Sequence, residues 1–221
     1  MCGRFTLTVN PADYLTGFRF PPIFAPRFNI APMQPLLAIP NDGRNAATFF
    51  LWGLLPFWAK DAAMAARMIN ARGETLAEKP SFRGAYKYRR CLILADGFYE
   101  WQKVAGTKKK IPHYIFMKSR QPFAFAGLWE DWESPDGSRV KTCIIITTKP
   151  NELVASIHNR MPVILPPNVF GQWLNRNPHV DLQSLLVPYP AEGMDAYPVS
   201  DMVNNAANDC AECVVPTQFL D

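Results

Sequence analysis

Residues 91–148 read CLILADGFYEWQKVAGTKKKIPHYIFMKSRQPFAFAGLWEDWESPDGSRVKTCIIITT, and this stretch decides the fold. Its apolar runs are rich in Ile, Phe, Tyr and Trp, which favour pleated, half-buried surfaces. The runs are CLILAD (91–96), GFYEWQKV (97–104), PHYIFM (112–117), FAFAGLW (123–129) and KTCIIITT (141–148). Turn residues separate them, and VAGTKKKIP (104–112) is typical of a hairpin tip. The pattern predicts a core dominated by antiparallel strands.

The flanking sequence adds further strands and several short helices. LLAIP (36–40), AATFFLWG (46–53) and DAYPVS (195–200) are strand-like. Short helices are expected at 10–17, where Asn10 caps and Pro11 follows, and at 75–90, 151–157, 167–176 and 180–187, while 60–68 is either helical or a loop. The chain has 21 prolines in 221 residues, which interrupts regular elements. We therefore predict one α+β domain over 1–221, with mainly antiparallel, curved or barrel-like sheets and several short helices.

The charge distribution is more informative than the net charge of +4. Residues 83–120 carry ten Lys or Arg against Asp96 and Glu100, a local net charge of +8. No Lys or Arg follows Arg176. A polyanion would therefore meet the central segment, although a solvated basic face explains the same pattern.

The opening residues MCGRFTLTVN lack the apolar core of a secretory signal, and no apolar run is long enough for a membrane span. We expect a cytoplasmic protein, nucleoid-associated if bacterial, with no membrane contact. Its five cysteines are an odd number, which argues against a disulfide framework. Cys91 and Cys143 begin strand-like runs, and Cys210-x-x-Cys213 lacks a second ligand pair, so we predict no metal and no cofactor.

Cys2 differs from the other cysteines because removal of Met1 would make it the N-terminal residue. An N-terminal cysteine carries a thiol and an α-amine whose ordinary pKa is about 8, so much of the amine is neutral near pH 7. A neutral amine attacks an aldehyde to form a Schiff base, and the thiol can then close a thiazolidine ring. Most residues at position 2 are simply frayed termini, which is the competing interpretation.

Polar residues within apolar segments supply candidate partners for Cys2. They are Asn70 and Arg72 in MINARGET, Glu100 in ADGFYEW, and His158 and Arg160 in SIHNRMP. A carboxylate and an imidazole can divide acid and base roles, while arginines bind phosphates. A buried hydrogen-bond network would use the same residue types.

Aromatic residues supply a second set of candidates. Trp52, Phe57 and Trp58 form an aromatic cluster broken by Pro56. Together with Trp101, this cluster could stack on exposed bases, although most tryptophans are core residues. His113 and His179 show no partner pattern and are assigned to structure.

Taken together, these segments resemble the SOS-response-associated peptidase (SRAP) family over nearly the full length. The matching motifs are MCGRF (1–5), RFNIAP (27–32), WGLLPFW (52–58), INARGET (69–75), CLILADGFYEW (91–101), AGLWE (126–130), IHNRMPVIL (157–165) and PVS…VN (198–204). Their order and spacing both agree with the family.

The resemblance implies a sensor and shield of abasic sites in single-stranded DNA, which forms a covalent thiazolidine crosslink through Cys2 after Met1 removal. The implied catalytic residues are Cys2, Asn70, Glu100 and His158. The implied DNA-binding residues are Arg4, Asn29, Trp58, Arg72, Trp101 and Arg160. Ala59 stands where many relatives have a second tryptophan.

The resemblance also implies lyase-like activity and Met1-removing peptidase activity. The expected partner is single-stranded DNA containing abasic sites, bound by a monomer, and replication-fork proteins are further candidate partners. Two alternatives remain: a non-covalent single-stranded nucleic-acid-binding module, and an N-terminal-nucleophile peptidase that needs no basic channel.

Overall fold

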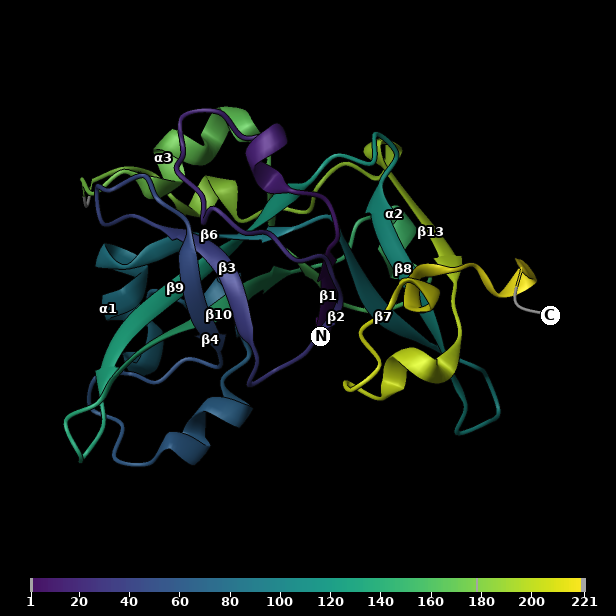
Figure 1. Ribbon diagram of the computed structural model, residues 1–221, viewed down its shortest axis with the longest axis horizontal. Helices are drawn as coiled ribbons and strands as arrows, with labels where there is room; N and C mark the ends of the chain where they lie inside the picture. The colour runs from purple at the N-terminus through teal and green to yellow at the C-terminus, as the bar shows by residue number, and fades with distance from the viewer. Residues whose placement is uncertain (1, 178, 220–221) are drawn as a thin grey trace.

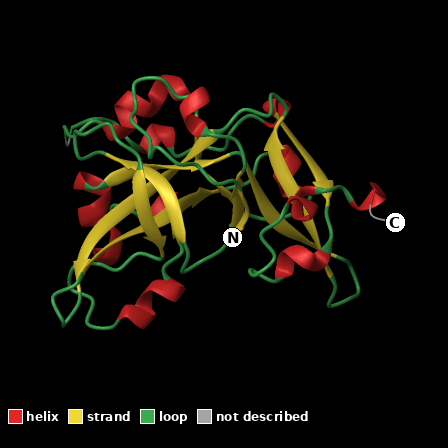
Figure 2. Ribbon diagram, viewed as in Figure 1, coloured by secondary structure: helices red, strands yellow, loops and turns green. Residues whose placement is uncertain are grey.

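The computed structural model describes residues 2–177 and 179–219 (Figures 1 and 2). The strands are β1 (Arg4–Leu7), β2 (Arg27–Ile30), β3 (Pro35–Pro40), β4 (Thr48–Trp52), β5 (Asn70–Arg72), β6 (Arg90–Ala95), β7 (Gly97–Lys103), β8 (Lys110–Met117), β9 (Phe123–Glu133), β10 (Arg139–Thr148), β11 (Met161–Pro162), β12 (Ile164–Leu165) and β13 (Met194–Pro198). The α-helices are α1 (Pro80–Tyr88), α2 (Glu152–Ala155) and α3 (Phe170–Leu174). The 3₁₀ helices are η1 (Pro11–Asp13), η2 (Ala62–Arg67), η3 (Gly73–Thr75), η4 (Pro167–Val169), η5 (Gln183–Leu185), η6 (Ala191–Gly193), η7 (Asp201–Asn204), η8 (Ala211–Val214) and η9 (Thr217–Phe219).

One sheet closes on itself as a barrel. Its strands follow the order β10-β4-β3-β6-β9, and β9 pairs again with β10. The β10–β4 pairing is parallel, and the other pairings of the ring are antiparallel. β5 adds to β10 in parallel, and β11 and β12 add to β10 and β9. The closed ring fits the long β9 and β10, which can each pair with several neighbours.

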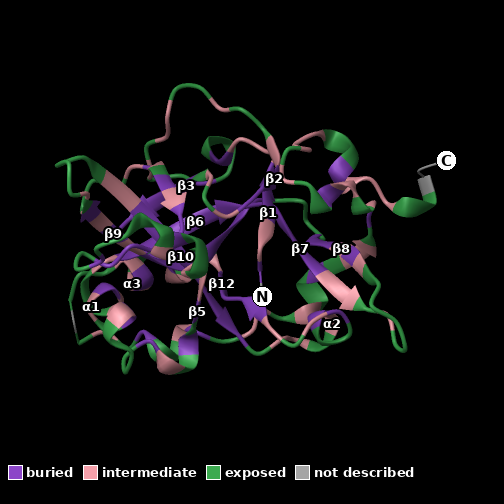
Figure 3. Ribbon diagram, turned by 90° about the horizontal axis from the view of Figure 1, so that it is seen from below, coloured by how far each residue is buried: buried purple, intermediate pink, exposed green. Residues whose placement is uncertain are grey.

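The barrel interior is apolar because its central strands carry almost continuous apolar runs. Every residue of β6 is buried, and β9 and β10 are buried over most of their length (Figure 3). Gly127 in β9 is required by close packing, since a Cβ there would lie 2.7 Å from Ile93 Cδ1 and 2.9 Å from Cys91 Sγ. Cys91 and Cys143 are both fully buried, which confirms them as core residues.

A second, antiparallel sheet has the order β13-β8-β7-β1-β2 (Figure 1). The chain passes from the barrel strand β6 to β7 through a single residue, Asp96, which is buried. Its carboxylate accepts hydrogen bonds from the Thr6 hydroxyl and from Thr8 and Val9 at the end of β1. Buried acceptors are costly when unpaired, so these donors fix β1 beside β7 at the point where the two sheets meet.

The α+β class and the antiparallel strands of 91–148 are as the sequence predicts, and the hairpin tip joins β7 to β8. The helices are shorter than predicted. The segment expected to be helical over 10–17 forms only η1, where Asn10 accepts from Ala12 N–H. Within 75–90, the α-helix α1 begins only at Pro80.

No helix within the described residues is long and apolar enough to cross a membrane.

The segment 203–209 is held against the second sheet by buried polar contacts. Asn29 is completely buried, and its Nδ2 donates to the carbonyls of Val203, Asn205 and Asn208 at 3.2, 3.1 and 2.8 Å. Asp209 pairs with Arg27 and accepts from the backbone N–H of residues 28 and 29. A single amide therefore binds three carbonyls that are far away in sequence.

Replacing Asn29 with Ala should destabilise the protein by about 2–3 kcal/mol, because the three carbonyls lose their common donor. The contact with Val203 is buried and the other two are part-buried, so water replaces the lost donor only incompletely. Urea unfolding measures this change in the free energy of unfolding. Asn168→Ala, at an exposed position of η4, is the matched control and should change it by less than about 0.5 kcal/mol. Equal unfolding midpoints for the two variants would contradict the assignment.

Candidate functional site

The four predicted catalytic residues come from four separate segments. Cys2 precedes β1, Asn70 begins β5, Glu100 lies in β7 and His158 follows α2. β1 pairs with β7 so that Arg4 lies opposite Tyr99, and this register directs the start of the chain towards Glu100. β5 pairs with β10, and β10 also pairs with β11 just after His158. The strand pairings therefore bring these segments to the junction of barrel and second sheet.

Cys2 is tethered directly to Asn70. The Asn70 Nδ2 donates a hydrogen bond of 2.7 Å to the Cys2 carbonyl oxygen. The Cys2 side chain is fully buried, and its Sγ lies 3.8 Å from the Arg4 carbonyl oxygen. Burial, reinforced by the negative charge of Glu100, raises the pKa of the Cys2 thiol well above its usual range. The thiol is therefore held in its neutral form.

Glu100 and His158 are two titratable side chains that lie close together at this junction. His158 Nε2 lies 3.9 Å from Glu100 Oε2. Burial of Glu100 raises the pKa of its carboxyl to about 7, because desolvation disfavours the charged form. Burial likewise lowers the pKa of His158. His158 Nδ1 lies 3.0 Å from the Arg160 backbone nitrogen and 3.1 Å from the Arg160 carbonyl oxygen, and these contacts orient the ring so that Nε2 faces Glu100.

Arg72 and Arg160 lie together at one edge of the site. Arg72 is exposed at the end of β5, opposite Thr147 in the β5–β10 register. The Arg160 guanidinium donates to the Thr147 carbonyl at 2.7 Å and forms a bidentate pair with Glu74, at 2.6 and 2.9 Å. Both arginines therefore border one patch of surface beside His158.

Arg4 and Trp101 bind the segment that Asn29 also holds. Arg4 donates to the carbonyls of Val203 and Asn204 at 2.9 and 3.3 Å, and Trp101 Nε1 donates to Asn204 Oδ1 at 2.7 Å. Arg4 and Trp101 are partly exposed, whereas Asn29 is completely buried. The Asn29 amide already donates to three carbonyls, so in this structure Asn29 holds the 203–209 segment, and its expected DNA contact stays a prediction.

The aromatic residues divide into core and surface groups. Trp52 is completely buried and its Nε1 donates to the Ile69 carbonyl, so it belongs to the core and not to a stacking surface. Trp58 is 47% exposed and Phe57 is 72% exposed. Ala59, at the position of the second tryptophan of many relatives, is buried. The exposed aromatic rings of this segment are therefore those of Phe57 and Trp58.

Sequence reasoning missed Glu74 and set His113 aside. Glu74 stands two residues after Arg72 in INARGET, and this acidic neighbour was the available signal. His113 lies directly opposite Glu100 in the β7–β8 register, on the same face of the sheet. Only a correct pairing of the two strands would have revealed that position.

No group of three or more His, Cys, Asp or Glu side chains arranged to hold a metal occurs among the described residues. In the Cys210-x-x-Cys213 motif, Cys213 is buried and its Sγ donates to the Asn208 carbonyl at 3.3 Å, while Cys210 is partly exposed. Both cysteines lie in the C-terminal segment that packs on the second sheet.

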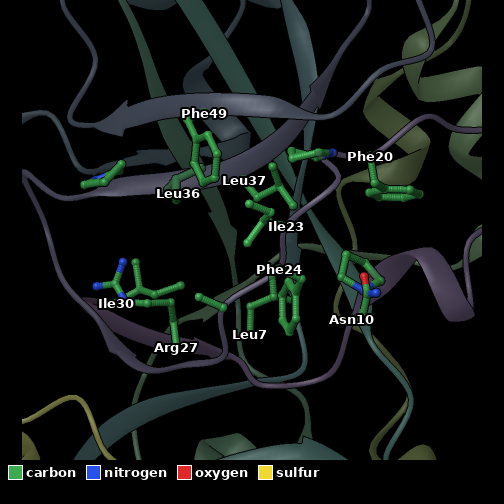
Figure 4. A pocket seen from close by; sticks show the side chains of 14 residues that line it. Leu7, Asn10, Phe20, Ile23, Phe24, Arg27, Ile30, Leu36, Leu37 and Phe49 are labelled. Carbon is green, nitrogen blue, oxygen red and sulfur yellow. The ribbon is translucent and has the colours of Figure 1, made fainter.

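An apolar groove lies on β1, β2 and β3, under the loop that carries Ile23 and Phe24 (Figure 4). Leu7, Leu37 and Phe49 line it from the strands. None of its lining residues belongs to the Cys2, Asn70, Glu100 and His158 group. The groove is therefore separate from the residues that carry chemistry.

Comparison with known proteins gives consistent results at the level of the family. The family model described as SOS response associated peptidase (SRAP) matches residues 1–206. Abasic site processing protein YoqW of Bacillus subtilis (strain 168) is 50% identical over 222 residues, covering 97% of this chain and 99% of its own. Abasic site processing protein HMCES of Rattus norvegicus is 29% identical, covering 100% of this chain and 77% of its own.

Solved structures agree with this relationship. A crystal structure of a Bacteroides thetaiotaomicron protein superposes with a TM-score of 0.77 at 31% identity, covering 85% of this chain and 84% of its own. A Bordetella bronchiseptica protein superposes with a TM-score of 0.78 at 25% identity, covering 90% of this chain and 100% of its own. With a family match over residues 1–206 and a half-identical relative that aligns over almost all of both chains, the chain belongs to the SOS response associated peptidase (SRAP) family.

Proposed function

We propose that this protein senses and shields abasic sites in single-stranded DNA by a covalent crosslink to Cys2. The observation that carries the proposal is the convergence of Cys2, Asn70, Glu100 and His158 from four distant segments. The names of the related proteins, abasic site processing proteins, support the substrate. Removal of Met1 is a condition, because only a free Cys2 carries an α-amine.

The DNA backbone is expected to follow the arginines. Arg72 and Arg160 border the site, and the exposed Trp58 and Phe57 supply aromatic faces. Phosphate contacts and stacking bind single strands with little dependence on base sequence. Selectivity for a lesion that has no base must therefore come from the covalent step.

The covalent step begins at the ring-opened sugar, whose C1′ is an aldehyde. The neutral α-amine of Cys2 adds to C1′, and the resulting carbinolamine loses water to form an imine. The thiol then adds across the C=N bond: the C–S bond forms, the thiol proton moves to nitrogen, and a thiazolidine ring closes. Since burial keeps the thiol protonated, the amine acts first and the sulfur second.

Glu100 and His158 are the proposed proton carriers. A carboxyl with a pKa of about 7 can take a proton from the amine and return one to the departing water. His158 Nε2 faces the same space and, in the tautomer or charge state that carries a proton there, is suited to donate to the sugar ring oxygen during opening. Asn70 fixes the Cys2 backbone so that its amine and thiol approach C1′ together.

Thiazolidine formation consumes the imine before it can undergo β-elimination, so the strand remains intact. Slow elimination from the same imine would constitute the lyase-like activity. Glu100, whose charge acts on Cys2, is also the proposed base for hydrolysis of the Met1–Cys2 bond, the peptidase activity.

Incubating the Met1-free protein with a single strand that carries one abasic site should give a shifted band on a denaturing gel. Cys2→Ala should abolish that band, because it removes the sulfur that closes the ring, and mass spectrometry should find the adduct one water lighter than the sum of protein and DNA. Cys210→Ala, at a partly exposed cysteine, is the matched control and should crosslink like the parent. Absence of a shifted band from the Met1-free parent would refute the covalent mechanism, and tight binding alone would favour the non-covalent alternative.

Crosslinking should accelerate as pH rises through about 7, because Glu100 is increasingly ionised and can then accept a proton. Glu100→Gln should slow the single-turnover rate about 10- to 100-fold at pH 8, with a smaller deficit at pH 5, where the parent Glu100 is mostly protonated. The rate is measured by quenched gel assays across this pH range. Glu192→Gln, at an exposed position, is the control. A parent and a Glu100→Gln variant with parallel pH profiles would exclude Glu100 as the proton carrier.

A further inference from the structure

The anion-binding edge of Arg160 is already occupied by a carboxylate of the same chain. Glu74 Oε1 and Oε2 accept from Arg160 Nη1 and Nη2 at 2.6 and 2.9 Å. This two-point geometry is the one by which arginine binds a phosphate. Arg160, which is proposed to bind the DNA backbone, is therefore already paired in this structure with the Glu74 carboxylate, which is negatively charged like a phosphate.

The two partners differ in how firmly they are held. The Arg160 side chain is 15% exposed, whereas the Glu74 side chain is 51% exposed. Arg160 has a second anchor in Thr147, whose carbonyl accepts at 2.7 Å and whose hydroxyl oxygen lies 3.3 Å away. Without Glu74, Thr147 still holds the guanidinium in place. Glu74 is therefore the partner that can leave, and it is not needed to position Arg160.

Arg72 completes the setting of the pair. It lies opposite Thr147 in the strand register. The hydrogen bond from Arg160 lowers the pKa of Glu74 below its usual range, and the charges of Arg160 and then of Arg72 add to this effect. Glu74 therefore stays ionised at neutral pH. The patch formed by Arg72, Arg160 and Glu74 carries one net positive charge, and it would carry two if Glu74 were neutral or displaced.

We propose that Glu74 is a built-in stand-in for a phosphate, which occupies Arg160 until a phosphodiester of the DNA strand displaces it. The proposal rests on the proposed function, since it concerns the same backbone-binding edge. The displacement subtracts from the affinity for any strand. A single phosphate contact must open the Arg160–Glu74 pair by itself and is therefore disfavoured. A strand that is also held at several other points is disfavoured less. Glu74 thereby limits binding to undamaged DNA, where no covalent bond follows.

The test measures equilibrium binding of the full-length protein to an undamaged, fluorescent oligothymidylate over a series of salt concentrations. Glu74→Gln should bind about threefold to tenfold more tightly than the parent. Because Arg160 contacts the same phosphate in both complexes once Glu74 is displaced, the slope of log K against log salt should stay nearly unchanged. A slope steeper by about 0.7 would mean that Arg160 contacts a phosphate only in the variant, and it would overturn the displacement. In an Arg160→Gln background the Glu74→Gln effect should shrink towards none, since the two residues act as one pair.

Glu78→Gln is the matched control, because it removes the same charge from an exposed carboxylate four residues further along. Unchanged or weaker binding by Glu74→Gln overturns the proposal, and so does an equal gain in Glu78→Gln, which would reflect general electrostatics. The parent is tested in parallel for crosslinking to an abasic strand. If the parent forms no crosslink, the proposed function is refuted. The binding result on undamaged DNA still decides the role of Glu74.

Discussion

The antiparallel pairing of β1 with β7 is the constraint on which the rest of the site depends. Arg4 lies opposite Tyr99 in this pairing, so the residues just before β1 run beside Glu100. The buried Asp96 holds the pairing by accepting hydrogen bonds from Thr6, Thr8 and Val9. Asp96 is also the single residue that connects the barrel strand β6 to β7 of the second sheet. Its carboxylate therefore ties the junction of the two sheets to the position of Cys2.

Burial then assigns the chemical roles. Glu100 and His158 are removed from water, so desolvation raises the pKa of the acid and lowers that of the base. Desolvation moves the pKa of the Glu100 carboxyl from an ordinary value of about 4 to about 7, and it favours the neutral ring of His158. Neither needs a permanent charge to exchange protons with a substrate. The same burial keeps the Cys2 thiol protonated, which is why the proposed mechanism begins with the amine.

The arginines differ from Glu100 and His158, because an arginine side chain remains charged even when it is partly buried. Arg4 is directed inward to the carbonyls of Val203 and Asn204 and stabilises the C-terminal segment. Arg160 is balanced by Glu74, while Arg72 lies exposed at the end of β5. The three arginines that the sequence nominates for DNA binding thus have three distinct surroundings.

The sequence by itself determined the strands of 91–148 and the fold class, because runs of Ile, Phe and Tyr broken by turn residues have few other stable uses. Its family motifs also nominated Cys2, Asn70, Glu100 and His158. Only the tertiary structure decided that Trp52 and Asn29 are buried and that Glu74 occupies Arg160. Arg160 and Glu74 are 86 residues apart, and a contact at that separation depends on how β5 and β10 align, which no local pattern encodes.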